Sequence, residues 1–141
     1  MIDRRTVLSA LGVLAVSGML LTGCSAGTQS KADACKLIQS DASSAATTLE
    51  AAFTKIQDDP AAAEKALKNF DTKWTSAVAK VTNPTVRAAG DASVKSLNAL
   101  DADLKKYVAD PTDSDVVDSL QSNADKVQTA FNKLGTVCSA A

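Results

Sequence analysis

Few side chains in this sequence are suited to catalysis. Among its 141 residues there is no histidine, which removes the usual general base near neutral pH, every Ser-His nucleophile pair and the commonest zinc ligand. The chain also contains no glycine-rich phosphate loop and no Gly-X-Ser-X-Gly elbow. The hydroxyls of residues 43–48 have no base placed nearby, and we interpret them as the polar face of a helix. We therefore expect a protein that is not an enzyme and that uses no cofactor or metal ion.

Aspartates gather in two short segments and form the main candidate binding surface, which we call the acidic tip. They are Asp58, Asp59, Asp110, Asp113, Asp115 and Asp118. One interpretation is local, because carboxylates at helix N-termini complement the helix dipole. The other is a docking surface for a basic partner, or a weak divalent cation site. A dedicated calcium site is not expected, because Asp113-Ser114-Asp115 lacks the glycine and the closing glutamate of a calcium loop.

Residues 1–24 have the layout of an export signal. Arg4 and Arg5 precede residues 7–21, which carry no charge and are too short to span a bilayer, since that needs ~20 apolar residues. The stretch ends in Leu21-Thr22-Gly23-Cys24, which resembles the lipobox of bacterial lipoprotein precursors. This resemblance implies cleavage before Cys24 and a diacylglyceryl group on its thiol. It also implies a protein that is lipid-anchored on the extracytoplasmic face of the cell membrane.

The sequence leaves the route of export open. Residues 4–8 (Arg-Arg-Thr-Val-Leu) resemble a twin-arginine export signal, although Asp3 stands where Ser or Thr is usual and Val7 where Phe is usual. The same two arginines serve equally well as the basic region of a general secretion signal. The twin-arginine route exports folded proteins, so the choice decides on which side of the membrane the domain folds.

The chain beyond the signal is long enough for one domain. We assign residues 1–23 to the signal peptide, 24–30 to a flexible lipid-anchored tether and 31–141 to the folded domain. The 15 basic and 16 acidic side chains of the whole chain nearly balance, with a formal net charge of −1. This balance argues against a nucleic-acid partner, which would need a basic stripe. Because the tether is short, we expect the domain to lie close to the membrane.

Three prolines divide the domain into four segments. Each follows an aspartate or asparagine, in Asp59-Pro60, Asn83-Pro84 and Asp110-Pro111. Such a residue at the N-cap, with proline in the first turn, is a helix-start signal. The third case is looser, and Thr112 or Asp113 is an alternative cap.

Apolar and small residues recur in each segment at alternating steps of three and four, which indicates one buried face for each helix. These stripes run over residues 35–56, 63–81, 86–107 and 117–138. The loops between the segments are short, so neighbouring helices should be antiparallel. The sequence therefore predicts an all-α fold, an up-down-up-down four-helix bundle.

Residue sizes support this topology. If the first helix lies beside the fourth in the opposite direction, Leu49 falls opposite Ala124, and each layer sets a small residue against a large one. In the hairpin of the second and third helices, the turn sets Trp74 near Gly90 and Ser93. We therefore interpret Trp74 as a core residue that fills the space left by small neighbours.

Two cysteines remain once Cys24 is assigned to lipid. Cys35 and Cys138 lie on the core stripes of their helices, at the same end of the predicted bundle. In an oxidising compartment, such an even pair predicts a disulfide that closes the bundle. A redox-active pair is not expected, because active dithiols usually occur in Cys-X-X-Cys motifs.

Basic residues near the same end form a second candidate surface, the basic end. They are Lys31, Lys36, Lys80, Arg87 and Lys133. Lys80 and Lys133 suit helix C-termini, whereas the others stand at helix starts, where the helix dipole disfavours a cation. Next to a lipid anchor, this placement suggests contact with anionic headgroups. The alternative is a set of ordinary solvated side chains.

These observations favour a non-catalytic envelope lipoprotein that acts as an interaction or scaffold module. It would be held in the membrane by Cys24 and would offer its acidic tip to another envelope component, a protein or a lipid. The alternative is a carrier of a small apolar or lipid ligand, because small residues line two of the stripes. A core pocket above ~300 Å³ lined by Phe53 or Trp74 would favour the carrier, and a filled core would favour the interaction module.

Overall fold

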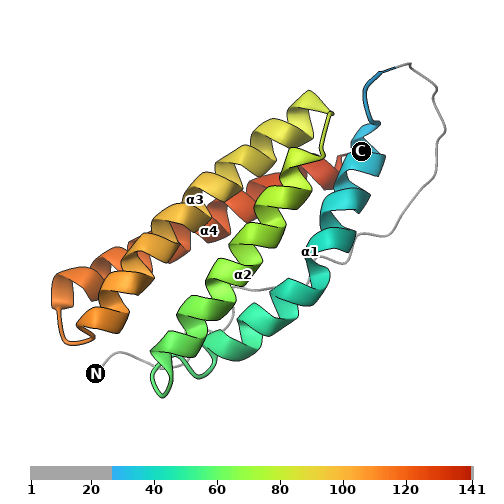
Figure 1. Cartoon of the computed structure of the whole chain (residues 1–141). Coiled ribbons are helices and arrows are strands. Elements are labelled where there is room, and N and C mark those ends of the chain that lie inside the picture. The colour runs from blue at the N-terminus through green and yellow to red at the C-terminus, as the bar shows by residue number, and fades with distance from the viewer. Residues whose placement is uncertain (1–26, 141) are drawn as a thin grey trace.

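The computed structural model describes residues 27–140, and all regular structure in this range is helical (Figure 1). The helices of this range are α1 (Lys31–Phe53), α2 (Pro60–Ala79), α3 (Pro84–Ala109) and α4 (Ser114–Ser139). The prediction of an all-α fold is thus confirmed. The signal peptide and the lipidation residue Cys24 lie outside the described residues.

A polar side chain caps the start of each helix by accepting a backbone hydrogen bond from the first turn. The caps are Ser30, Asp59, Asn83 and Asp113. Pro60 and Pro84 follow their caps directly, as the sequence predicts. Pro111 instead lies in the turn before α4, so the fourth helix begins after the alternative cap, Asp113.

The predicted stripes of α2 and α3 form most of the core. The buried stripe residues are Ala63, Leu67, Phe70, Trp74 and Ala77 in α2, Val81 just after it, and Val86, Gly90, Ser93, Leu97, Leu100 and Leu104 in α3. Leu67, Leu97 and Leu104 are at most 1% exposed. Full burial of such a side chain contributes about 1.5–3 kcal/mol relative to an exposed one. The buried residues of α2 and α3 therefore supply much of the apolar stabilisation.

Trp74 is a core residue, as predicted. It is 5% exposed, and its Nε1 donates a hydrogen bond of 2.8 Å to Ser93 Oγ, which donates in turn to Gly90 O. The rings of Phe70 and Phe131 flank the indole, with centroids 5.7 and 4.7 Å from it. The hydroxyl of Ser93 thus satisfies the one polar group of a buried indole, which would otherwise be costly to bury.

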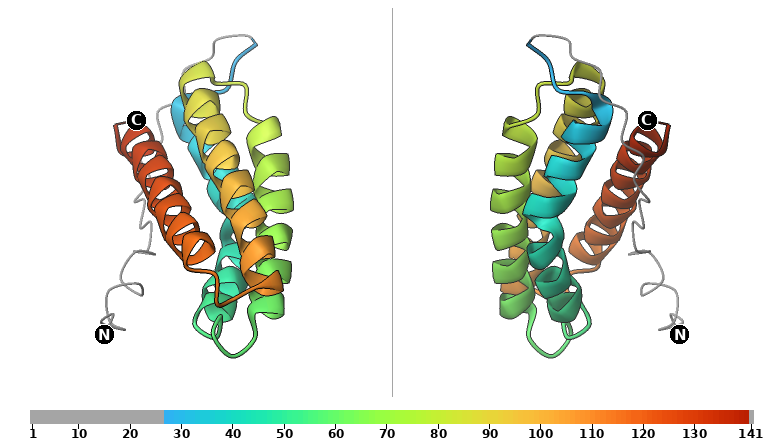
Figure 2. Two further views of the ribbon diagram at one scale, coloured as in Figure 1. Left: turned by 90° about the vertical axis from the view of Figure 1, so that its left-hand side faces the viewer. Right: turned by 90° about the vertical axis from the view of Figure 1, so that its right-hand side faces the viewer.

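The first and last helices pack together less than predicted. They meet at few positions, among them the Cys35–Cys138 disulfide, which confirms the predicted bond and whose Cα atoms are 5.8 Å apart. Figure 2 shows α4 inclined to the other helices. Ala124 is exposed, although the predicted layers set it opposite Leu49, and Leu134 is the one buried residue of α4. That layered packing is wrong because α4 packs mainly on α3.

The end of the predicted tether is fixed to the turn between α2 and α3. The backbone N–H of Gln29 donates to Thr82 Oγ1, and its side-chain Oε1 accepts from Thr82 N, both at 2.9 Å. Asn83 Nδ2 also donates to Gln29 O. The segment from Cys24 to Gln29 can span at most about 18 Å when fully extended.

Candidate functional site

The acidic tip lies at the end of the molecule away from the C-terminus, in the two loops there and in the first two turns of α4 (Figures 1 and 2). Asp59 and Asp113 cap α2 and α4, and Asp110 Oδ1 accepts hydrogen bonds from the N–H and hydroxyl of Thr112. Those two bonds hold the pKa of Asp110 below its usual value. Local structure therefore accounts for half of the tip. All six side chains are exposed, and the three that neither cap a helix nor bind Thr112 are Asp58, Asp115 and Asp118.

Two cations of the basic end complement the C-termini of neighbouring helices. The guanidinium of Arg87 donates to Ala79 O and Val81 O, at the end of α2, at 3.2 and 3.4 Å. Lys31 Nζ donates to Ala140 O, at the end of α4, at 3.4 Å. The helix dipole favours a cation at a C-terminus. The antiparallel neighbours thus explain two placements that look unfavourable along the sequence, without any contact to the membrane.

The other residues of the basic end have separate surroundings. Lys80 Nζ forms an ion pair of 2.7 Å with Asp41, which links α2 to α1. Lys36 is exposed, and Lys133 is an exposed residue on the wall of a cleft between α3 and α4. The basic end is therefore a set of individually partnered or solvated cations, of which Lys80 and Lys133 each line a cleft.

Asp103 of α3 is a buried carboxylate, 4% exposed. Its Oδ2 accepts hydrogen bonds from Ser119 Oγ, at 2.6 Å, and from Asn123 Nδ2, both on α4. Its Oδ1 accepts one from Lys106 Nζ at 2.9 Å. The bonds from Ser119 and Lys106 hold the pKa of Asp103 below its usual value in spite of burial, so the group is ionised at neutral pH. The network fixes how α4 is placed on α3.

This network was not predicted from the sequence, where the aspartates near helix starts drew attention and Asp103 did not. The signal that could have found it is spacing. Asp103 lies three residues after the core residue Leu100, and Ser119 and Asn123 are four residues apart on the next helix. Three polar residues at helical spacing beside apolar stripes are typical of a buried polar network, but their pairing depends on the rotation of α4 against α3.

Asp71 of α2 and Asp101 of α3 form a pair of neighbouring carboxylates away from helix starts. Each has a buried Oδ1 atom without a hydrogen-bond partner. The other oxygen of Asp101 accepts a hydrogen bond from Lys105 Nζ. Burial and the neighbouring charge of Asp101 raise the pKa of Asp71. The pair therefore disfavours the folded state when both carboxylates are charged.

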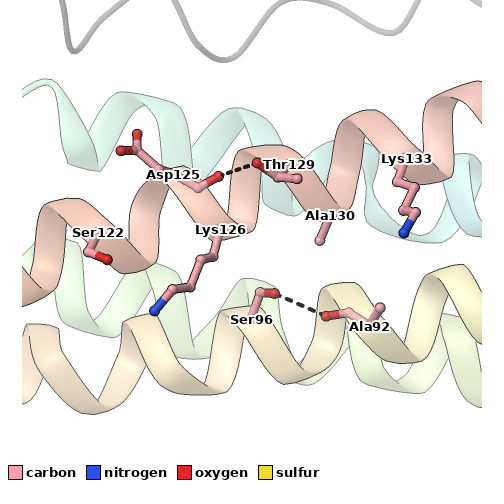
Figure 3. Close-up of a pocket in the computed structure, with 8 residues that line it drawn as sticks. All are labelled: Ala92, Ser96, Ser122, Asp125, Lys126, Thr129, Ala130 and Lys133. Atoms are coloured by element: carbon pink, nitrogen blue, oxygen red, sulfur yellow. Dashed lines mark hydrogen bonds between the residues drawn. The ribbon is translucent and has the colours of Figure 1, made fainter.

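Two open clefts mark the surface. The larger, of about 470 Å³, lies between α3 and α4 and is lined by Ala92, Ser96, Ser122, Asp125, Lys126, Thr129, Ala130 and Lys133 (Figure 3). The smaller, of about 350 Å³, is lined by Asp41, Thr72, Lys73, Ser76 and Lys80 of α1 and α2. Polar and small side chains form both walls. Neither cleft includes Phe53 or Trp74, so neither is the apolar core pocket that would favour a carrier.

The remaining candidate groups have ordinary roles in the described part of the chain. Within residues 27–140, no three or more His, Cys, Asp or Glu side chains are grouped to hold a metal ion. The hydroxyls of Ser43, Thr47 and Thr48 donate to carbonyls of their own helix. No helix in this range combines the length and apolar character that a membrane span requires.

Known proteins do not identify the site, since no family model, curated protein or solved structure matches the chain at a significant level. Two surfaces carry charged side chains that neither cap a helix nor form an ion pair within residues 27–140. They are Asp58, Asp115 and Asp118 of the acidic tip, and the cleft between α3 and α4.

Proposed function

We propose that the chain is a lipid-anchored, non-catalytic envelope lipoprotein that acts as an interaction or scaffold module. Its domain is interpreted as an up-down-up-down four-helix bundle closed by the disulfide. The observation that carries the proposal is the attachment of Gln29 to the α2–α3 turn, near the disulfide end. With a lipid on Cys24, this attachment would turn the disulfide end toward the membrane and the acidic tip away from it.

The acidic tip is the surface that this orientation offers to a partner. Asp58, Asp115 and Asp118 are exposed, and none of them is the N-cap of a helix. A basic surface on another envelope protein would be attracted by them, because charge complementarity speeds encounter and selects partners. The proposed partner is therefore an envelope protein with a basic docking surface.

Lipidation is tested by mass spectrometry of the full-length gene product extracted from membranes. We expect a chain that starts at Cys24 and carries a diacylglyceryl group. The Cys24→Ser variant should lack the lipid, whereas a Ser25→Ala variant, which keeps the thiol, should carry it. A processed wild-type chain without lipid would contradict the proposed anchor.

The acidic tip is tested in intact cells with a photoreactive residue in place of Gln57, an exposed position beside Asp58. We expect a discrete adduct with a basic envelope protein. Asp58→Asn combined with Asp118→Asn should reduce the adduct strongly. Asp91→Asn combined with Asp125→Asn removes the same charge from exposed positions elsewhere and should leave it unchanged. No adduct, or an equal loss in both double variants, would contradict docking at the tip.

A second candidate function, a carrier of a small apolar or lipid ligand, is favoured by the incomplete burial of α4. Leu120, Val127 and Phe131 of its stripe are only partly buried, and α1 covers little of that helix. A bound acyl chain would remove this apolar surface from water. Solvent extraction of the purified protein followed by mass spectrometry tests this function. A stoichiometric lipid that is not attached to Cys24 would support the carrier, and a ligand-free protein would exclude it.

A further inference from the structure

The cleft between α3 and α4 has two cations among its lining residues, Lys126 and Lys133 (Figure 3). Small side chains create the hollow, with Ala92 and Ser96 on α3 and Ala130 on α4. Lys126 and Lys133 stand on α4 seven residues apart, so they are two turns, or about 10 Å, apart along the helix axis. A ligand that contacts both lysines must therefore span a similar length, about 10 Å, and gains most if it carries negative charge at more than one point.

Lys126 is oriented by the buried network around Asp103. The ionised carboxylate of Asp103 accepts the Nδ2 donor of Asn123, so the amide oxygen of Asn123 faces the opposite way. That oxygen accepts a hydrogen bond of 2.9 Å from Lys126 Nζ. Two successive hydrogen bonds thus lead from a buried anchor to the cation at the cleft. A cation that is ordered before binding loses less conformational entropy when a ligand arrives.

Neither lysine of the cleft is neutralised by a carboxylate in the described part of the chain. The ion pairs formed within residues 27–140 use other basic residues, namely Lys80, Arg87, Lys105 and Lys106. Asp125 belongs to the cleft wall, but Figure 3 shows its carboxylate directed away from α3, whereas both lysine side chains extend toward α3. The cleft therefore presents two uncompensated positive charges to a ligand.

The hydroxyl groups between these charges are set to accept hydrogen bonds. Ser96 Oγ donates its proton to Ala92 O, and Thr129 Oγ1 donates its proton to Asp125 O. Within residues 27–140 neither hydroxyl oxygen accepts a hydrogen bond, so the lone pairs of both are open to a donor on the ligand. A matching ligand therefore offers anionic groups to the lysines and hydroxyl donors to the oxygens that lie between them.

We propose that this cleft binds a phosphorylated polyol, in which phosphate groups alternate with hydroxyl-bearing carbons. The phosphates would contact Lys126 and Lys133, because ammonium groups form strong charge-assisted hydrogen bonds with phosphate. The ligand hydroxyls would donate to Ser96 and Thr129. A soluble glycerol phosphate chain has this pattern within one molecule, whereas two neighbouring phosphatidylglycerol headgroups, each with one phosphate and two hydroxyl groups, would supply it together. Binding at the cleft does not depend on a lipid at Cys24, so a failure of this proposal can be distinguished from a failure of the proposed function.

The test is an isothermal titration of the full-length protein in a neutral detergent. One arm uses a soluble glycerol phosphate oligomer, and a second uses phosphatidylglycerol in mixed micelles of the same detergent. A third arm uses inorganic polyphosphate, which carries closely spaced phosphates but no hydroxyl groups on carbon. The test variant combines Lys126→Gln with Lys133→Gln. The control combines Lys65→Gln with Lys68→Gln, which removes the same charge from exposed positions of α2.

We expect the oligomer, the lipid headgroup or both to bind the wild-type protein, and the arm that binds identifies the source of the ligand. The test variant should bind about thirtyfold more weakly, since each lysine near a phosphate surface contributes several-fold. The control variant should stay within about twofold of the wild type. Absence of binding in both arms, or an equal loss in both variants, overturns the proposal. Polyphosphate binding as tight as that of the oligomer overturns its polyol part. Urea unfolding followed by Trp74 fluorescence verifies that each variant is folded.

Discussion

Replacing Asp103 with alanine should weaken the attachment of α4 to α3. The carboxylate is 4% exposed and accepts hydrogen bonds from Ser119 and Asn123, and each bond to a charged group contributes about 1.5–3 kcal/mol. The bond from Lys106, whose side chain is 64% exposed, adds only about 0–1 kcal/mol. Water can reach the half-buried Ser119 and Asn123 in the variant and recover part of the loss. We therefore expect Asp103→Ala to lower the free energy of unfolding by about 2–4 kcal/mol.

The assay is urea unfolding with the disulfide intact, followed by the fluorescence of Trp74, the single tryptophan of the chain. Its ring lies against Phe131 of α4, so the signal reports on the docking of that helix. The hydrogen bonds from Ser119 and Lys106 lower the pKa of Asp103 in the folded state. Its contribution is thus present above the unfolded value of about 3.9 and is lost as the pH falls through the folded value. The difference between wild type and variant should shrink in acid.

A matched control is Asp91→Ala, which removes an exposed carboxylate of the same helix that pairs with Arg87. This substitution should change the free energy of unfolding by about 0.5 kcal/mol or less. If Asp103→Ala were as harmless as this control at neutral pH, or if its effect grew in acid, the reasoning would be refuted. The carboxylate would then be solvated, and α4 would be held on α3 by apolar contacts alone.

Three further predictions follow from the packing. Reduction of the disulfide should lower the free energy of unfolding by up to about 4–5 kcal/mol, because the bond joins residues separated by 103 positions, and an unchanged urea midpoint in reductant would contradict this. Gly90→Ala should cost about 1–2 kcal/mol after the gain in helix propensity, because its Cβ would lie 2.9 Å from Val78 Cγ1. Adding Val78→Ala should relieve that clash, and a single variant that melts like wild type by circular dichroism would show that no clash exists. Asp71→Asn should stabilise the protein at neutral pH, because burial and Asp101 raise the pKa of Asp71 and the charged pair disfavours folding. This gain should fade as the pH falls toward the unfolded value, and a gain that persisted in acid would exclude this cause.

Local signals in the sequence were sufficient to predict the helices and most of the central core. Asp59 and Asn83 satisfy backbone N–H groups within three residues, so their effect depends on the adjacent chain alone. The stripes of α2 and α3 needed only a helical period to indicate which residues are buried. The pairing of Cys35 with Cys138 followed from the topology and from their being the two cysteines of the folded domain. The lipid on Cys24 and the docking role of the acidic tip stay predictions.

The tertiary structure decided how α4 is placed, and with it the cleft and the buried carboxylate. The amphipathic pattern of α4 indicates an apolar face but not which neighbour covers it, and the helix packs on α3 while meeting α1 at few positions. The burial of Asp103 depends on the rotation and axial shift that bring Ser119 and Asn123 to it. Arg87 likewise stands at an unfavourable helix start until the end of α2 lies beside it. Each of these outcomes depends on contacts between side chains of two helices. The sequence of one helix does not determine which residues of the other it will contact.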